Sequence, residues 1–165
     1  MITWKKIWSL PLILVLVITV LDQWTKTQIA TSQYLRFGGK IEIIPEIFNI
    51  VYVTNTGAAW GMFSRQATLL AVISGIVFIV LVLWFRKFTD NFTERCVAVS
   101  LMLGGIAGNF IDRVSYGAVI DFLSFTYRSF EWPAFNVADS AICVGVTILA
   151  ISTLVRPETK LDAAR

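Results

Sequence analysis

Four long apolar runs constrain what this chain of 165 residues can fold into more than any other feature. A membrane-spanning helix needs roughly 20 predominantly apolar residues. The third run is the shortest and must borrow polar residues at its ends to reach that length. We therefore expect an all-α integral membrane protein, one domain over 1–165, with four transmembrane helices. The expected spans are about 7–29, 67–85, 96–113 and 134–155.

The composition agrees with this class and excludes several functions. Hydrophobic residues make up 56% of the chain, and charged residues make up 15%, against about 25% in typical soluble domains. The absence of histidine excludes Ser-His-Asp and Cys-His catalysis and most zinc chemistry. No basic face for nucleic acid is present. Cys96 and Cys143 lack metal-ligand spacing, so we expect both to be buried apolar side chains.

The distribution of basic residues predicts the orientation of the chain in the membrane. Two long connections, 30–66 and 114–133, contain few lysines and arginines. Three short segments are rich in them, namely the N-terminal tail, the link between the second and third spans, and the C-terminal tail. Because cytoplasmic segments are enriched in these residues, we expect both termini in the cytoplasm and both long connections outside. The short segments contain Lys5, Lys6, Arg86, Lys87, Arg95, Arg156, Lys160 and Arg165.

Within the first long connection, residues 40–54 are rich in Ile, Val, Phe and Tyr and are bounded by glycine-containing turns. This pattern predicts one or two short strands, with Pro45 at a break or an edge.

Four aspartates gather at one membrane surface once the orientation is fixed. Asp22 and Asp112 lie near the outer ends of the first and third spans, and Asp121 lies in the outer loop before the fourth. Asp139 is the sixth residue of the fourth span, roughly 8 Å below its outer end. An ionisable residue within a membrane is by default a hypothesis of function.

Two of these aspartates have local basic neighbours that offer a structural explanation. Asp22 and Lys26 are four residues apart, the spacing and order of a helical ion pair. Asp112 precedes Arg113, and the two could form a local pair at the end of a helix. Both pairs therefore favour a supporting role.

Asp121 and Asp139 are harder to explain structurally. Asp139 could belong to a helix cap that begins at Asn136. Asp121 has no nearby base and could be an exposed loop acid. Alternatively, two carboxylates that share one site can hold a single proton between them, which is what aspartyl proteolysis needs.

Several polar and small residues share the same outer side. Asn109 and Asn136 each lie three residues before an aspartate, on the same helix face, and Asn55 opens a turn. These amides could hold a substrate backbone, or they could cap helices and turns. Gly104 and Gly108 form a G-x-x-x-G pattern that predicts a helix-packing face.

The sequence resembles the lipoprotein signal peptidase family, signal peptidase II. The resemblance is carried by five motifs in family order, which are LDQWTK (21–26), NTGAAWG (55–61), GNFIDR (108–113), VIDF (119–122) and FNVADS (135–140). It implies that Asp121 and Asp139 are catalytic, and it adds a small extracytoplasmic β-cradle over about 40–62 with a loop over the site. It implies substrate contacts by Asn55, Asn109, Arg113 and Asn136. It implies structural support of the site by Asp22, Lys26, Asp112 and Gly108.

The activity implied by this resemblance is that of an aspartyl endopeptidase in the bacterial inner membrane, with its active site on the periplasmic side. Its substrates would be prolipoproteins carrying a diacylglyceryl group, cleaved just before the lipidated cysteine. Its other partner would be membrane lipid, its inhibitor class globomycin, and its state a monomer. We expect no metal and no cofactor.

The competing interpretation is a proton-coupled transporter or channel subunit, because acids within a membrane also mark ion pathways. The clustering of the acids at one surface, with no ionisable group in the second span, speaks against it.

Overall fold

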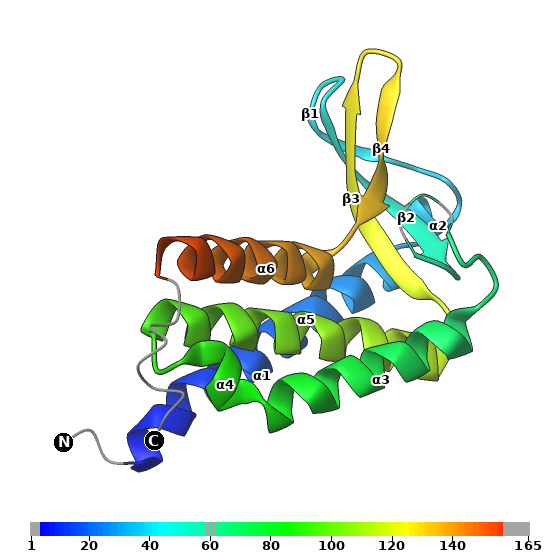
Figure 1. The fold of residues 1–165 in the computed structure, drawn as a ribbon. Coiled ribbons are helices and arrows are strands. Elements are labelled where there is room, and N and C mark those ends of the chain that lie inside the picture. Colours follow the sequence, from blue (N-terminus) through cyan, green and yellow to red (C-terminus); the bar gives the residue numbers. More distant parts are fainter. Residues whose placement is uncertain (1–3, 59, 61, 157–165) are drawn as a thin grey trace.

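The computed structural model describes residues 4–58, 60 and 62–156, so Lys160 and Arg165, which entered the orientation argument, lie outside it. The elements form a helical bundle with a small sheet at one end (Figure 1). The helices are α1 (Trp4–Thr31), α2 (Gln33–Arg36), α3 (Ala67–Leu83), α4 (Phe85–Thr89), α5 (Thr93–Tyr116) and α6 (Val137–Val155). The strands are β1 (Ile41–Ile44), β2 (Phe48–Asn55), β3 (Val119–Tyr127) and β4 (Phe130–Phe135).

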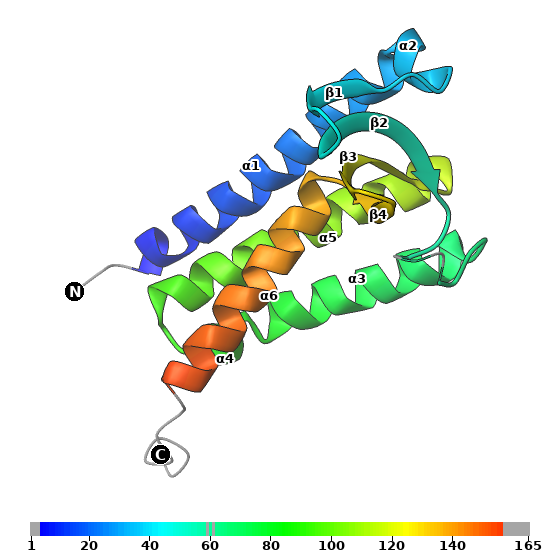
Figure 2. The ribbon, with the colours of Figure 1, turned by 90° about the horizontal axis from the view of Figure 1, so that it is seen from above.

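Helix α5 is the centre of the bundle. It contacts α1, α3 and α6, which surround it in Figure 2. Val99 and Leu103 on α5 pack with Leu81 of α3 in the apolar core. Where α1 crosses α5, a Cβ atom at Gly104 would lie 2.7 Å from the Cβ of Ile18. The G-x-x-x-G pattern is therefore a helix-packing face, as predicted.

Three helices in the described part of the chain are long and apolar enough to cross a membrane. They are α1 over Leu10–Thr31, α5 and α6. The expected second span forms α3, an apolar helix of 17 residues that is shorter than the other three. A membrane protein built of helices is thus confirmed, and crossing by α3 stays a prediction.

The sheet has four antiparallel strands in the order β1-β2-β3-β4. Its first hairpin confirms the strands predicted for 40–54, with Pro45 in the turn between β1 and β2. Figure 1 shows the sheet at the end of the bundle where α5 ends and α6 begins. The start of α1 and the end of α6 lie at the opposite end.

The second long connection was predicted wrongly as a loop. Residues 119–127 and 130–135 form β3 and β4, so an all-α description understates the fold. The first four residues of β3 are all buried, which removes the alternation of apolar and polar residues that marks a strand with one face in water. Helix α6 begins at Val137 instead of residue 134, because the preceding residues pair with β3 and Asn136 caps the helix.

Candidate active site

Asp139 lies in the first turn of α6, where it completes a capping box. The Asn136 side chain accepts a hydrogen bond from the Asp139 backbone N–H at 2.9 Å, and Asp139 Oδ2 accepts from the Asn136 N–H at 3.3 Å. The predicted cap is confirmed, but it uses only one carboxylate oxygen. Asp139 Oδ1 accepts from Asn109 Nδ2 at 2.7 Å, which joins α6 to α5.

Asp121 is buried in β3, and both of its oxygens accept hydrogen bonds from amide groups. Asn136 Nδ2 donates to Oδ1 at 2.7 Å, and Asn55 Nδ2 donates to Oδ2 at 3.1 Å. Burial, followed by the negative charge of Asp139, raises the pKa of Asp121 to about 7, against the opposing effect of the two amide bonds. This carboxyl therefore keeps its proton to a much higher pH than an ordinary aspartate does.

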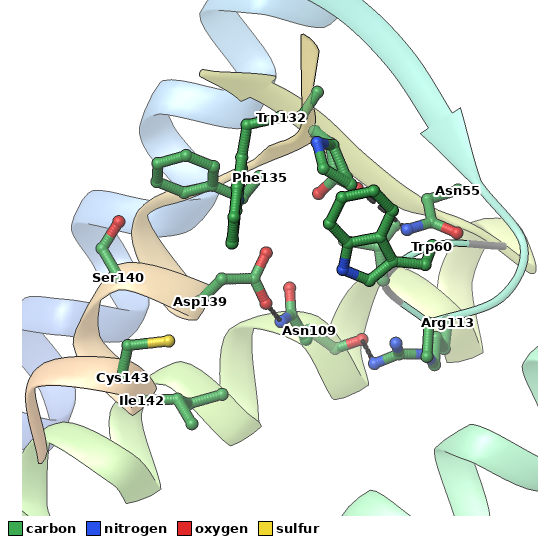
Figure 3. Close-up of a pocket in the computed structure, with 15 residues that line it drawn as sticks. Asn55, Trp60, Asn109, Arg113, Trp132, Phe135, Asp139, Ser140, Ile142 and Cys143 are labelled. Carbon is green, nitrogen blue, oxygen red and sulfur yellow. Dashed lines mark hydrogen bonds between the residues drawn. The ribbon is translucent and has the colours of Figure 1, made fainter. Parts of the chain in front are cut away.

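Both carboxylates line one cavity of about 470 Å³, together with Asn55, Asn109 and Arg113 (Figure 3). Asn136, the fourth predicted contact residue, lies behind them and links the two acids. The structure thus brings together every residue that the sequence predicted for catalysis and substrate contact.

The apolar wall of this cavity was not predicted. Trp60 and Trp132 meet edge to face with their ring centres 5.6 Å apart, and both line the cavity. Cys143 also lines it and is exposed, so the prediction of a buried thiol at this position was wrong. It faces the cavity because it follows Asp139 by four residues, one helical turn. Cys96 is half-buried.

Lys26 lies behind the cavity, where its side chain is only 2% exposed. Its Nζ atom lies 2.8 Å from Asp22 Oδ2 and 3.0 Å from Asp112 Oδ2, which confirms the predicted pair with Asp22. The same atom donates to Asn109 Oδ1 at 2.9 Å. The ion cluster therefore fixes the amide that binds Asp139.

Asp112 does not form the predicted local pair with Arg113. Adjacent helical residues point about 100° apart, and Asp112 faces α1, where it binds Lys26. Arg113 instead donates through Nη2 to the Gly57 carbonyl oxygen at 3.4 Å. It thereby connects α5 to the loop after β2.

Sequence reasoning missed Gln23. Its Nε2 atom donates to Asp112 Oδ1 at 2.8 Å and to the Gly108 carbonyl oxygen at 3.2 Å. A polar amide next to Asp22 in an otherwise apolar helix was the available signal. Gly108 belongs to the same contact, because a Cβ atom there would collide with Asp22 Oδ2.

We expect Gly108→Ala to destabilise the fold by about 1–3 kcal/mol, the usual cost of overpacking. The added methyl group would meet the Asp22 carboxylate, which is fixed by Lys26. Gly75→Ala is the matched control, since a Cβ atom there would make an ordinary 3.5 Å contact with the Phe110 ring. Thermal unfolding in detergent measures both. Equal unfolding temperatures for the two variants would contradict the close contact at Gly108.

The fold and the site together define a class of protein. It is a helical membrane protein with a cavity at one end of the bundle, and the cavity contains two carboxylates that accept hydrogen bonds from amide groups. A sequence model of signal peptidase (SPase) II matches residues 14–155. The chain therefore belongs to the signal peptidase II family and is a protease, so the transporter interpretation is set aside.

Individual relatives agree. The chain is 38% identical over 145 residues to a lipoprotein signal peptidase of Staphylococcus aureus, covering 88% of each chain. It is 41% identical over 145 residues to a lipoprotein signal peptidase of Syntrophotalea carbinolica, covering 86% of this chain and 88% of the relative. A bacterial membrane enzyme solved at 2.3 Å superimposes with a TM-score of 0.82 and 36% identity, over 92% of each chain. The sequence and the fold thus point to the same family.

Proposed function

We propose that this protein is an intramembrane aspartyl endopeptidase that removes the signal peptide from diacylglyceryl-modified prolipoproteins, cleaving just before the lipidated cysteine. Asp121 and Asp139 are the catalytic pair. The observation that carries the proposal is their shared cavity, in which amide groups bind all four carboxylate oxygens. Among the residues that the structure describes, neither carboxylate forms a salt bridge with a lysine or arginine.

The chemistry follows from one proton shared by two acids. The ionised carboxylate takes a proton from a water molecule as that water attacks the scissile carbonyl carbon. The protonated carboxyl polarises the carbonyl oxygen and later helps protonate the leaving amine. Because the titration belongs to the pair, neither residue is assigned permanently as acid or base.

The surrounding polar groups divide into two roles in this proposal. Asn55, Asn109 and Asn136 bind the carboxylates and so orient the catalytic pair. Asn55 and Asn109 also line the cavity and therefore face a substrate. Arg113 points into the cavity in Figure 3. Its buried Nε atom has no hydrogen-bond partner within the described chain, which leaves a donor for a substrate carbonyl.

The proposed topology follows from the distribution of basic residues and suits the lipid anchor of the substrate. We place four spans in the bacterial inner membrane, with α3 as the second, both termini in the cytoplasm and the cavity on the periplasmic side. A diacylglyceryl group would hold the scissile bond at headgroup level, the depth at which a cavity at the outer end of the bundle would meet it. One chain supplies every residue of the proposed site, which supports a monomer.

The test is an assay with purified protein and one prolipoprotein prepared with and without its diacylglyceryl group. We expect cleavage of the lipidated form only, and mass spectrometry should find a product that begins with the lipidated cysteine. Equal cleavage of the unmodified precursor would contradict the proposed substrate. No cleavage of either form would contradict the proposed function.

The pH dependence should follow Asp121. Its raised pKa of about 7 keeps the shared proton below that pH and releases it above. We therefore expect kcat/KM to fall as pH rises through about 7, since this ratio reports pKa values of the free enzyme. Asn55→Ala removes a hydrogen bond that lowers this pKa, so its falling limb should move to higher pH. A limb that does not move would contradict this role of Asn55.

A further inference from the structure

A second hollow, of about 460 Å³, lies between α5 and the later part of α6, on the side of the catalytic cavity that is away from the sheet. We propose that this α5–α6 groove binds the hydrophobic segment of the signal peptide while its end is cleaved; the proposal rests on the proposed function. The groove offers an apolar surface, because the Thr153 hydroxyl donates its hydrogen bond to the Leu149 carbonyl oxygen within α6, at 2.8 Å. Its lining residues are Met102, Val146, Leu149, Ala150, Thr153 and Leu154.

One face of α6 leads from the catalytic cavity into this groove. Asp139, Ile142 and Cys143 line the cavity, and Val146 and Ala150 line the groove. These positions follow one another at intervals of three and four residues, which places them on the same face of a helix. A peptide with its scissile bond at Asp139 would therefore continue along α6 into the groove.

The groove also suits close contact with a helix. At Gly145 a Cβ atom would lie 2.6 Å from the Ala98 carbonyl oxygen and 2.7 Å from Met102 Cγ, so α6 and α5 approach without an intervening side chain. Ala150 adds a small exposed side chain to the groove wall. A small residue such as Ala150 lets a helix pack closely within a membrane, where burial from water contributes little.

The length of the lined face matches a signal peptide. From Ile142 to Thr153 the helix rises about 16 Å at 1.5 Å per residue. The apolar segment of a signal peptide has about 7–15 residues, or about 10–22 Å if helical. In the proposed topology the peptide runs outward and α6 runs inward, so the end of the apolar segment would reach Asp139. We therefore assign the groove to the signal peptide; the acyl chains of the substrate are the alternative occupant that the last experiment below distinguishes.

Disulfide cross-linking tests the assignment directly. In a Cys96→Ser, Cys143→Ser background, whose own cleavage rate serves as the reference because Cys143 lines the catalytic cavity, Val146→Cys and Ala150→Cys report on the groove. Val144→Cys and Ile151→Cys are matched controls on the other face of α6, because Val144 is 50% and Ile151 57% exposed, similar to Val146 at 47%.

The partner in this experiment is a lipidated precursor with one added cysteine in the apolar segment of its signal peptide. Oxidation in membranes should cross-link it to the two groove positions at least several-fold more than to the two controls. Equal cross-linking on both faces, or none from the groove, would overturn the proposal.

A bulky side chain in the groove provides an independent readout. Ala150→Trp should raise KM about tenfold or more with kcat nearly unchanged, whereas Ile151→Trp should cleave like the wild type. A defect that disappears when the acyl chains of the substrate are shortened would assign the groove to the diacylglyceryl group and overturn the proposal. Normal cleavage by both variants would also overturn it while leaving the proposed function intact. Failure of the wild type to cleave would instead overturn the proposed function.

Discussion

Replacement of either Asp121 or Asp139 by asparagine is expected to lower the rate of prolipoprotein cleavage by about 100- to 10,000-fold, the range for loss of a general acid or base. Each change keeps the size of the side chain and removes its ability to share a proton. Both carboxylates already accept bonds from amide donors, so at Asp121 one amide nitrogen would face the donor of Asn55 or Asn136. Single-turnover cleavage and thermal unfolding together separate lost chemistry from lost folding.

The matched control for these variants is Asp90→Asn. Asp90 is half exposed at the other end of the bundle and has a φ of 46°, a conformation that asparagine also adopts. We expect its cleavage rate to stay within about twofold of the wild type. If Asp121→Asn or Asp139→Asn cleaves as fast as this control and unfolds at the wild-type temperature, the replaced aspartate does not take part in the reaction.

Lys26→Met is expected to destabilise the protein by about 3–5 kcal/mol, the cost of removing one partner from a buried ion pair. It would leave the buried carboxylates of Asp22 and Asp112 without their shared cation. Cleavage should fall as well, because Lys26 also fixes the Asn109 amide that binds Asp139. Thermal unfolding in detergent measures the first effect.

Two further variants make this prediction specific. Lys40→Met removes an exposed pair with Glu42 and should leave the unfolding temperature unchanged, since such pairs contribute little. Neutralising both acids in the Lys26→Met background, as Asp22→Asn with Asp112→Asn, should restore part of the lost stability. If Lys26→Met unfolds at the temperature of Lys40→Met, the ion cluster does not support the fold.

The sequence was sufficient to predict features determined by local pattern. Long apolar runs predicted the helices, and orientation by basic residues gathered the aspartates at one end. Asn136 and Asp139 are three residues apart, so their cap was also visible in the sequence. Asp22 and Lys26 pair within one helix for the same reason.

Features that depend on distant segments were not predictable from local pattern. Asp121 pairs in the sheet with Val53, 68 positions earlier. It therefore lies in a buried strand, β3, and not in the loop that the sequence predicted. Asp112 binds Lys26 across two helices instead of its neighbour Arg113. In each case a tertiary contact decided between local alternatives that the sequence had left open.

If Asp121 and Asp139 act as one proton-sharing unit, a variant that lacks both carboxylates should reveal it. Single-turnover cleavage of a lipidated prolipoprotein would be compared for Asp121→Asn, Asp139→Asn and both together. Residues that act as a unit give strongly non-additive losses, so we expect the double variant to be about as slow as the slower single variant. Losses that multiply would show that the two carboxylates act independently and do not share a proton.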